Sequence, residues 1–534
     1  MDFHSLRQRG QAKAQPLAEK TKLRLTRPSS WKLPKQNSSI APPDVWTNAD
    51  QGVPRAPGET HLDQMDIPHL LVQRLGHHSD LERGLYPNGL SATDAVLIVL
   101  VAGICNAIPT VLNGCIGSDL HIPFPIAARA SYGYWLSYFC VISRGILALF
   151  WFGVNSAGGG DCVTAIILAI WPSYANIPNH LPARIGVTPQ GMCSYLIYWL
   201  LQFPLLLVPT HKLQYMFNVK AVLTLPMALA MVIWISVKAG GGGQFFSAPA
   251  TVSGSTRSWL RLSSLTSVTG GYSTLAVNIP DFSRFSKESK APYWQLPFIP
   301  FLKTIVGLFG IVAASASREL YGEALWNPID IVNKWQGSSG GRAAAFFCGV
   351  IWLLAQISVN ISANSISFAN DITNLNPKWF NIRRGTIFAA LAGGWALCPW
   401  IIMASASAFL SFMSAYAIFM GVNWHALVTT LVVIVPLLPG LGNKVTPENV
   451  QLTVGLQHLF SFNWLYGYFM SIFLYYVLNF FFPDKGTLIE KTVPGFDETI
   501  DGVEADTESR GTDDRDEKGP RYSTAKEVPV SAMV

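Results

Sequence analysis

The chain has 534 residues, of which 50% are hydrophobic, 12% aromatic and only 13% charged. The charged share is well below that of an average soluble domain, so the composition excludes a soluble globular protein and predicts an integral membrane protein. The formal net charge of +6 combines a basic head with an acidic tail. Because no aromatic interleaving or folded module accompanies the basic head, we expect no nucleic-acid partner.

The sequence divides into three parts. Residues 1–90 are polar and punctuated by proline, and we expect them to be disordered. Residues 91–483 form a predicted multi-span helical domain, and residues 484–534 an acidic, disordered cytoplasmic tail. No secretory signal peptide is recognisable, so the first span is expected to direct insertion. The seven cysteines lack metal or redox spacing, and we expect neither a metal site nor a cofactor.

The apolar runs number about eleven and favour helices over barrel strands, because they are long, continuous and not alternating. In chain order the expected spans are 92–111, 135–156, 191–209, 217–237, 262–280, 296–314, 344–369, 386–404, 409–420, 427–439 and 465–482. The segment 162–171 is a candidate extension of the second span. Glycine and proline in 112–133 predict a loop there instead of a continuous helix.

The Lys and Arg residues between spans fall in alternate loops, which assigns those loops to the cytoplasm. They are Arg129, then Lys212 and Lys220, then Arg284, Lys287 and Lys290, then Lys378, Arg383 and Arg384. This assignment places the start of the first span, and with it the basic head, on the extracellular side, whereas basic segments normally lie in the cytoplasm. The conflict indicates that one span is absent from this chain.

One predicted span carries a row of uncharged polar side chains. Gln356, Asn360 and Asn364 follow at i,i+4, with Ser367 close behind, so they form a stripe on an otherwise apolar helix. A carboxamide in hydrocarbon needs a partner, so the stripe should face protein or a watery cavity. Asn364 is then a candidate to bind a planar solute, and structural bonding between helices is the alternative.

Two further clusters interrupt apolar spans. Trp151 and Asn155 share a helix face, where an indole could stack on a heteroaromatic ring and a carboxamide could bind its edge. The alternative is ordinary helix packing. Gly270, Gly271 and Tyr272 lie in the most polar span and predict a broken or partly unwound helix, with small-residue packing as the alternative.

Charged groups at the helix ends do not indicate catalysis. Asp281 and Asp371 each lie at a predicted helix end near basic residues, where a gate or a topology anchor is expected. We find no nucleophile motif or paired catalytic carboxylates in a supporting context, so no catalytic residue is assigned and an enzyme is not expected.

Four separated stretches resemble the nucleobase-cation symporter-1 family, especially its fungal uracil, uridine and allantoin permeases. They are VLNGCIGSDLHIPFPIAARASYG, RGILALFWFGVNSAGG, GGYSTLAVNIPDFSRF and NISANSISFANDITNLNPKWFNIRRG. The resemblance implies an all-α integral membrane protein of the leucine-transporter fold, with two inverted five-helix repeats. It also implies a multi-pass plasma-membrane permease that couples a cation to a nucleobase, nucleoside or allantoin-like solute.

The resemblance also implies site residues. Trp151 and Tyr272 match the family's two stacking aromatics, Gly271 lies beside the second, and Asn364 matches a hydrogen-bonding Asn. Asn155 stands where the family usually has Gln.

The cation-site region of sodium-coupled relatives matches Ala355, Ser358 and Val359. Val359 replaces a hydroxyl ligand, which weakens sodium coupling and favours a proton.

Two departures from the family pattern bear on function. The family's first span is absent between WTNADQ and GLSATDAVLIVL, and the end of its tenth span is absent near residues 420–424. The alternative hypothesis is therefore a transport-inactive receptor or a truncated remnant of the same fold.

Overall fold

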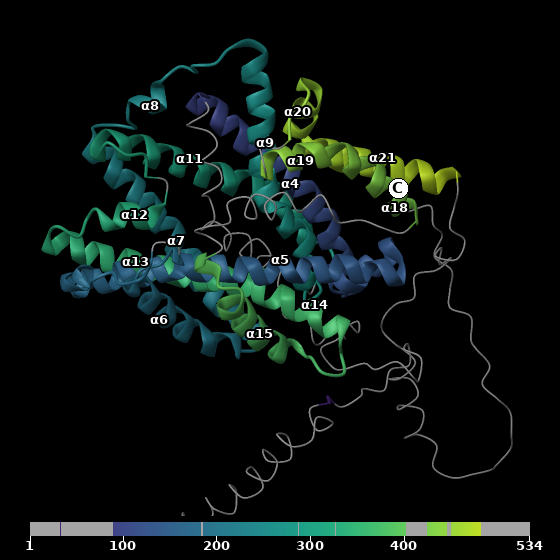
Figure 1. Ribbon diagram of the computed structural model, residues 1–534, viewed down its shortest axis with the longest axis horizontal. Helices are drawn as coiled ribbons and strands as arrows, with labels where there is room; N and C mark the ends of the chain where they lie inside the picture. The colour runs from purple at the N-terminus through teal and green to yellow at the C-terminus, as the bar shows by residue number, and fades with distance from the viewer. Residues whose placement is uncertain are drawn as a thin grey trace, which may run out of the picture. The chain divides into compact units, whose positions relative to one another are not determined.

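A computed structural model describes residues 32–33, 89–182, 185–286, 288–325, 327–401, 424–445 and 450–481, and these are almost entirely helical (Figure 1). The long helices are α4 (Ala92–Leu120), α5 (Phe124–Ile170), α6 (Pro189–Leu206), α7 (Thr210–Ala239), α9 (Gly254–Asn278), α11 (Gln295–Tyr321), α13 (Ser339–Val359) and α21 (Asn463–Phe481). The shorter ones are η4 (Pro172–Asn176), α8 (Gln244–Ser247), α10 (Pro280–Ser283), η6 (Ala291–Trp294), α12 (Pro328–Asn333), α14 (Ser367–Leu375), α15 (Ile382–Leu391), α18 (Trp424–Ile434), η10 (Val435–Leu437), α19 (Leu438–Val445) and α20 (Val454–Ser461). Two π-helical segments, η7 (Asn360–Ile366) and η8 (Ala392–Ala396), complete the set. The predicted disordered head and tail and the two predicted deletions lie almost wholly outside the described residues.

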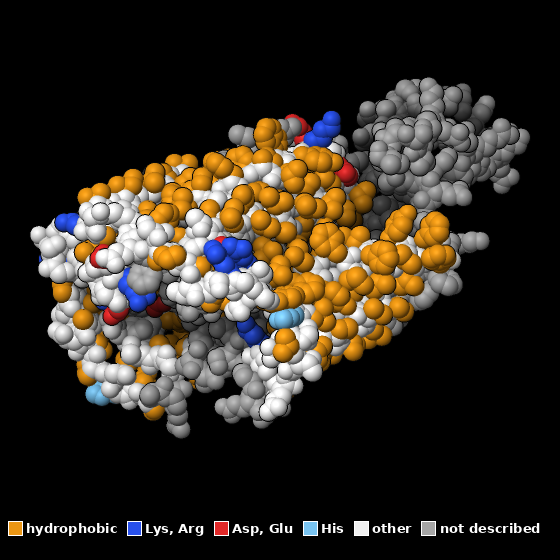
Figure 2. All heavy atoms as spheres, turned by 90° about the horizontal axis from the view of Figure 1, so that it is seen from above, with side chains coloured by type: hydrophobic (Ala, Val, Ile, Leu, Met, Phe, Trp, Pro, Cys, Tyr) orange, Lys and Arg blue, Asp and Glu red, His pale blue; other side chains and the backbone are white. Residues whose placement is uncertain are grey.

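Six of the described helical stretches are long and apolar enough to cross a bilayer. They are Ala92–Leu120, Ser137–Ile170, Tyr215–Ala239, Ala291–Tyr321, Ser339–Leu375 and Asn463–Phe481. Figure 2 shows hydrophobic side chains over a broad area of the visible face, with charged side chains in a few small groups. The predicted all-α membrane class is confirmed. The expected span 409–420 lies outside the described residues.

Helix α4 is longer than predicted, because it continues through Gly114 and Gly117 to Leu120. A Cβ at Gly117 would lie 2.8 Å from the Cα of Pro280, and one at Gly114 2.9 Å from the Cβ of Pro292. These glycines therefore permit α4 to pack closely against α10 and η6. The prediction of a loop over 112–133 was wrong, because α4 and α5 are helical on both sides of a loop limited to residues 121–123.

Helix α5 packs against α6, α13 and α14 and is uninterrupted over its 47 residues, about 70 Å at 1.5 Å per residue (Figure 1). It includes the segment 162–171 up to Ile170, so the predicted extension is confirmed. Two glycines allow its neighbours to approach closely. A Cβ at Gly153 would lie 2.6 Å from the carbonyl oxygen of Gly393, and one at Gly159 2.0 Å from the ring of Tyr198.

Helix α9 is continuous through Gly270 and Gly271, so the predicted break at these glycines was wrong. The helix packs along α4, and its end comes at Asn278, before Pro280 begins α10. Lys220 was likewise assigned to a loop, but it is a fully buried residue of α7. A π-helical segment instead interrupts the span with the polar stripe, where η7 separates α13 from α14.

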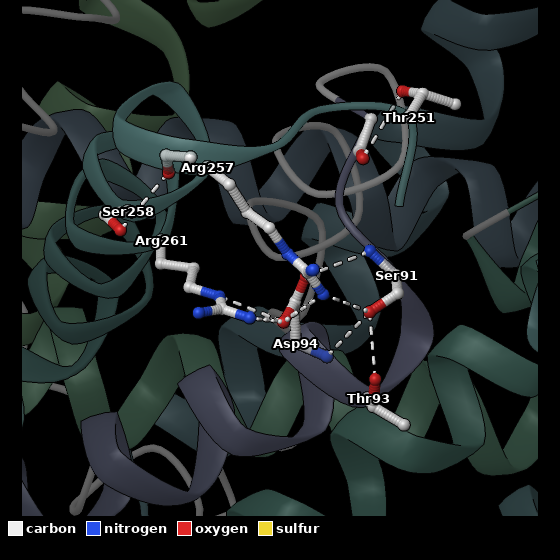
Figure 3. Close-up of polar contacts among 9 residues, drawn as sticks. Ser91, Thr93, Asp94, Thr251, Arg257, Ser258 and Arg261 are labelled. Carbon is white, nitrogen blue, oxygen red and sulfur yellow. Dashed lines mark hydrogen bonds and ion pairs between the residues drawn. The ribbon is translucent and has the colours of Figure 1, made fainter. Parts of the chain in front are cut away.

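Asp94 ties the start of α4 to the start of α9 (Figure 3). Its carboxylate accepts hydrogen bonds from the Nε atoms of Arg257, at 3.0 Å, and Arg261, at 2.9 Å. Asp94 is 2% exposed and also completes a capping box with Ser91. A single buried carboxylate thus fixes the relative position of the two helix ends.

Replacing Asp94 with Asn should lower the stability of the detergent-solubilised protein by about 1–2 kcal/mol, because the charge-assisted hydrogen bonds from two partly exposed arginines are weakened. Thermal unfolding followed by size-exclusion chromatography measures this. The matched control is Asp119→Asn, an exposed aspartate at the other end of α4, which should leave the melting temperature unchanged. Equal melting temperatures for the two variants would contradict the assigned role.

Candidate functional site

The polar stripe lies where the regular helix of α13 changes into the π-helical segment η7. The wider turn is accompanied by side-chain bonds to the backbone: Ser362 Oγ donates to the Ser358 carbonyl at 2.9 Å. The Ala363 carbonyl accepts a long hydrogen bond from Nδ2 of Asn278, at the end of α9. Single π turns inside α-helices occur frequently at functional sites, which makes η7 the first place to look for one.

Asn360, the first residue of η7, is fully buried and bonded to two other helices. Its Nδ2 lies 3.2 Å from the Phe152 carbonyl oxygen and 3.0 Å from Ser156 Oγ, both on α5. The same nitrogen lies 3.2 Å from Oε1 of Gln202, on α6. Asn360 therefore joins α5, α6 and η7.

Asn364 lies one turn further and is 6% exposed. Its Nδ2 donates to Oδ1 of Asn360 at 2.9 Å, so the two asparagines of the stripe are directly connected. Among the described residues, nothing donates a hydrogen bond to Asn364 Oδ1. The carboxamide thus keeps an acceptor that no described residue uses.

Trp151 and Asn155 lie on the turn of α5 that Asn360 contacts. Asn155 is 3% exposed, whereas Trp151 is half-buried and packs edge-on against Phe150, with ring centroids 5.6 Å apart. The structure thus brings η7 and this turn of α5 together.

Gly271 and Tyr272 lie on α9, the helix whose end reaches η7 through Asn278. For these two residues the structure describes only the backbone.

Ala355, Ser358 and Val359 are all buried on α13. Ser358 is the one residue of the three with a polar side chain, and its Oγ donates to the Leu354 carbonyl at 2.7 Å. Ala355 and Val359 offer only backbone groups as cation ligands. No group of three or more His, Cys, Asp or Glu side chains in the described ranges could hold a metal ion.

A buried ionic cluster centred on Arg144 was missed by the sequence analysis. Arg144, on α5, is 2% exposed, and its Nη1 lies 3.0 Å from Oδ2 of Asp281. Its Nε donates to Oδ2 of Asp371 at 2.9 Å, and its Nη2 pairs with Oδ1 of the same carboxylate. Nη1 also donates to Oδ1 of Asn278 at 3.2 Å. The guanidinium therefore joins α5, α9, α10 and α14.

The cluster connects directly to the polar segment, because Asn278 bonds both Arg144 and the Ala363 carbonyl of η7. The signal for it was present in the sequence as one arginine inside an apolar run. Intramembrane charges are normally paired, so Asp281 and Asp371 were the available partners. What the sequence could not indicate was that one arginine serves both.

A family profile for permeases of cytosine and purines, uracil, thiamine and allantoin matches residues 84–422, more than half of the chain. The chain belongs to this nucleobase-cation symporter-1 family. It is 34% identical to an uncharacterised permease of Schizosaccharomyces pombe, over 82% of this chain and 85% of that one. It is 33% identical to the uracil permease of Saccharomyces cerevisiae, over 72% and 68% of the two chains.

The fold is similar to that of Mhp1, a nucleobase-cation-symport-1 family transporter solved in a closed conformation with bromovinylhydantoin bound. The likeness covers 83% of this chain and 97% of that one, with a TM-score of 0.59 at 17% identity. The expected leucine-transporter-like fold is thereby confirmed, as is a multi-pass integral membrane permease. The family consists of transporters, and the comparisons do not favour the receptor or remnant alternative.

Proposed function

We propose that this permease imports a nucleobase, nucleoside or allantoin-like solute across the plasma membrane together with a proton. The observation that carries the proposal is the unused acceptor of Asn364, held beside the turn of α5 that bears Trp151 and Asn155. The substrates in the family's description, among them uracil and allantoin, support the solute class.

In this proposal the solute's ring stacks on Trp151, and the carboxamides of Asn155 and Asn364 bind its polar edge. Gly271 permits close approach of α9, and Tyr272 covers the opposite ring face. No covalent step is needed, because transport requires only that solute and proton bind the outward-open and inward-open states with different affinity.

A proton is favoured over sodium because the matched cation region offers a single hydroxyl, Ser358, beside the apolar Ala355 and Val359. Sodium prefers several oxygen ligands.

Uptake should therefore rise as external pH falls from 7.5 to 5, by roughly 10-fold or more, and should collapse when a protonophore is added. Replacing external sodium with choline should leave the initial rate unchanged. Radiolabelled initial-rate uptake in intact cells measures all three. Sodium-dependent, pH-independent uptake would contradict proton coupling while leaving the solute class intact.

A further inference from the structure

Three carboxamides form a connected series from α6 into the proposed solute site. Gln202 Oε1 lies 3.2 Å from Asn360 Nδ2, and Asn360 Oδ1 accepts from Asn364 Nδ2 at 2.9 Å. Gln202 is 1% exposed and Asn360 is fully buried. We propose that Gln202 is a positioning residue that, together with the Phe152 carbonyl and Ser156, sets the direction of the Asn364 carboxamide, and thereby the class of solute edge the site accepts. This inference rests on the proposed function.

The direction of the central amide follows from the groups around it. The Phe152 carbonyl can only accept a hydrogen bond, so Asn360 must turn its NH2 group toward it. Ser156 Oγ donates its own proton to the same carbonyl at 2.8 Å, which leaves its oxygen free to accept from Asn360. Asn360 Oδ1 therefore points away from α5, toward Asn364.

Gln202 supplies the third acceptor around the Asn360 NH2 group. Its own Nε2 is buried and has no hydrogen-bond partner among the described residues. Reversing the Gln202 amide would not relieve this, because two NH2 groups would then face each other. The observed orientation leaves Gln202 Nε2 without a described partner, which costs free energy, and places Gln202 Oε1 as an acceptor next to the Asn360 NH2 group.

The consequence for Asn364 is that one N–H is committed to Asn360. We infer that the N–H anti to Oδ1 makes this bond, which leaves Oδ1 and the syn N–H side by side on the free edge. That pair is complementary to a carbonyl with an adjacent N–H, the edge of a lactam or a ureide. A solute methylated at that nitrogen loses the donor that Oδ1 requires, so the series selects planar lactams and ureides over their N-methylated analogues.

The test replaces Gln202 with Met, which keeps the volume and removes the acceptor. The matched control is Gln295→Met on α11, where a fully buried carboxamide has no hydrogen-bond partner among the described residues and no connection to η7. Cells expressing each form are assayed for uptake of radiolabelled uracil and allantoin. Competition by 1-methyluracil and 3-methyluracil gives the discrimination against methylated edges.

We expect Gln202→Met to raise KM roughly 3- to 10-fold, as for loss of one hydrogen bond, with the maximal rate and surface delivery within about two-fold of wild type. Discrimination against at least one methyluracil should fall by a similar factor. A merely structural role would instead lower delivery and leave discrimination unchanged. Gln295→Met should match wild type in every measurement.

Two results would overturn the inference. If Gln202→Met shows the KM and discrimination of Gln295→Met while wild type transports, the positioning role is wrong and the proposed function stands. If wild type at the membrane takes up neither uracil nor allantoin, the proposed solute class fails and this inference fails with it.

Discussion

Replacing Arg144 with Met is expected to destabilise the protein so strongly that little folded protein is found in the membrane. The change leaves the carboxylates of Asp281 and Asp371, which are 0% and 1% exposed, without their shared cation. Removing one partner from a buried ion pair costs about 3–5 kcal/mol, comparable to the stability of a whole domain. Surface quantification and size-exclusion profiles of a fluorescent fusion measure the loss.

Two further variants distinguish this cause from a general effect of the substitution. Arg342→Met, on the first turn of α13, removes a guanidinium that has no partner among the described residues and should be neutral. The triple variant Arg144→Met, Asp281→Asn, Asp371→Asn removes all three charges and should recover much of the folded fraction. A triple variant less stable than Arg144→Met would contradict the view that unpaired carboxylates are the cause.

Replacing Asn364 with Ala is expected to lower the ratio of maximal rate to KM by at least about 30-fold, the equivalent of two lost hydrogen bonds, with surface delivery retained. The change removes the unused acceptor and also the donor to Asn360 Oδ1. Initial-rate uptake over a range of solute concentrations measures the ratio.

The control for Asn364→Ala is Asn374→Ala, another buried asparagine of the same span, whose Nδ2 donates to the backbone carbonyl of Asn370 and to no other described residue. It should lower uptake no more than it lowers surface delivery. Unchanged uptake by Asn364→Ala would return the polar stripe to a purely structural role.

Hydropathy was sufficient to predict the all-helical class and to locate α4, α5, α7, α11 and α13. Bilayer thickness imposes a minimum length on apolar helices, and this signal is local in sequence. The errors at α4 and α9 came from reading glycine only as a helix breaker. At Gly114, Gly117 and Gly271 the helix continues, and at the first two the absence of a side chain permits a neighbouring segment to approach.

The candidate site was predicted in part. The stripe that contains Asn364 follows from helical periodicity, but the π turn and the partners of Asn360 do not. Phe152 lies 208 residues from Asn360, and Gln202 lies 158 residues away, so no local pattern connects them. The roles of Trp151 and Tyr272 stay predictions, because they depend on a bound solute.

The most direct measurement is initial-rate uptake of radiolabelled uracil, uridine and allantoin by cells that lack their own permeases and express this chain at the surface. Our account predicts saturable uptake of at least one of them, competed by the lactams or ureides it also binds and lost in Asn364→Ala. No saturable uptake of any of the three, with the wild-type chain demonstrably at the surface, would contradict it.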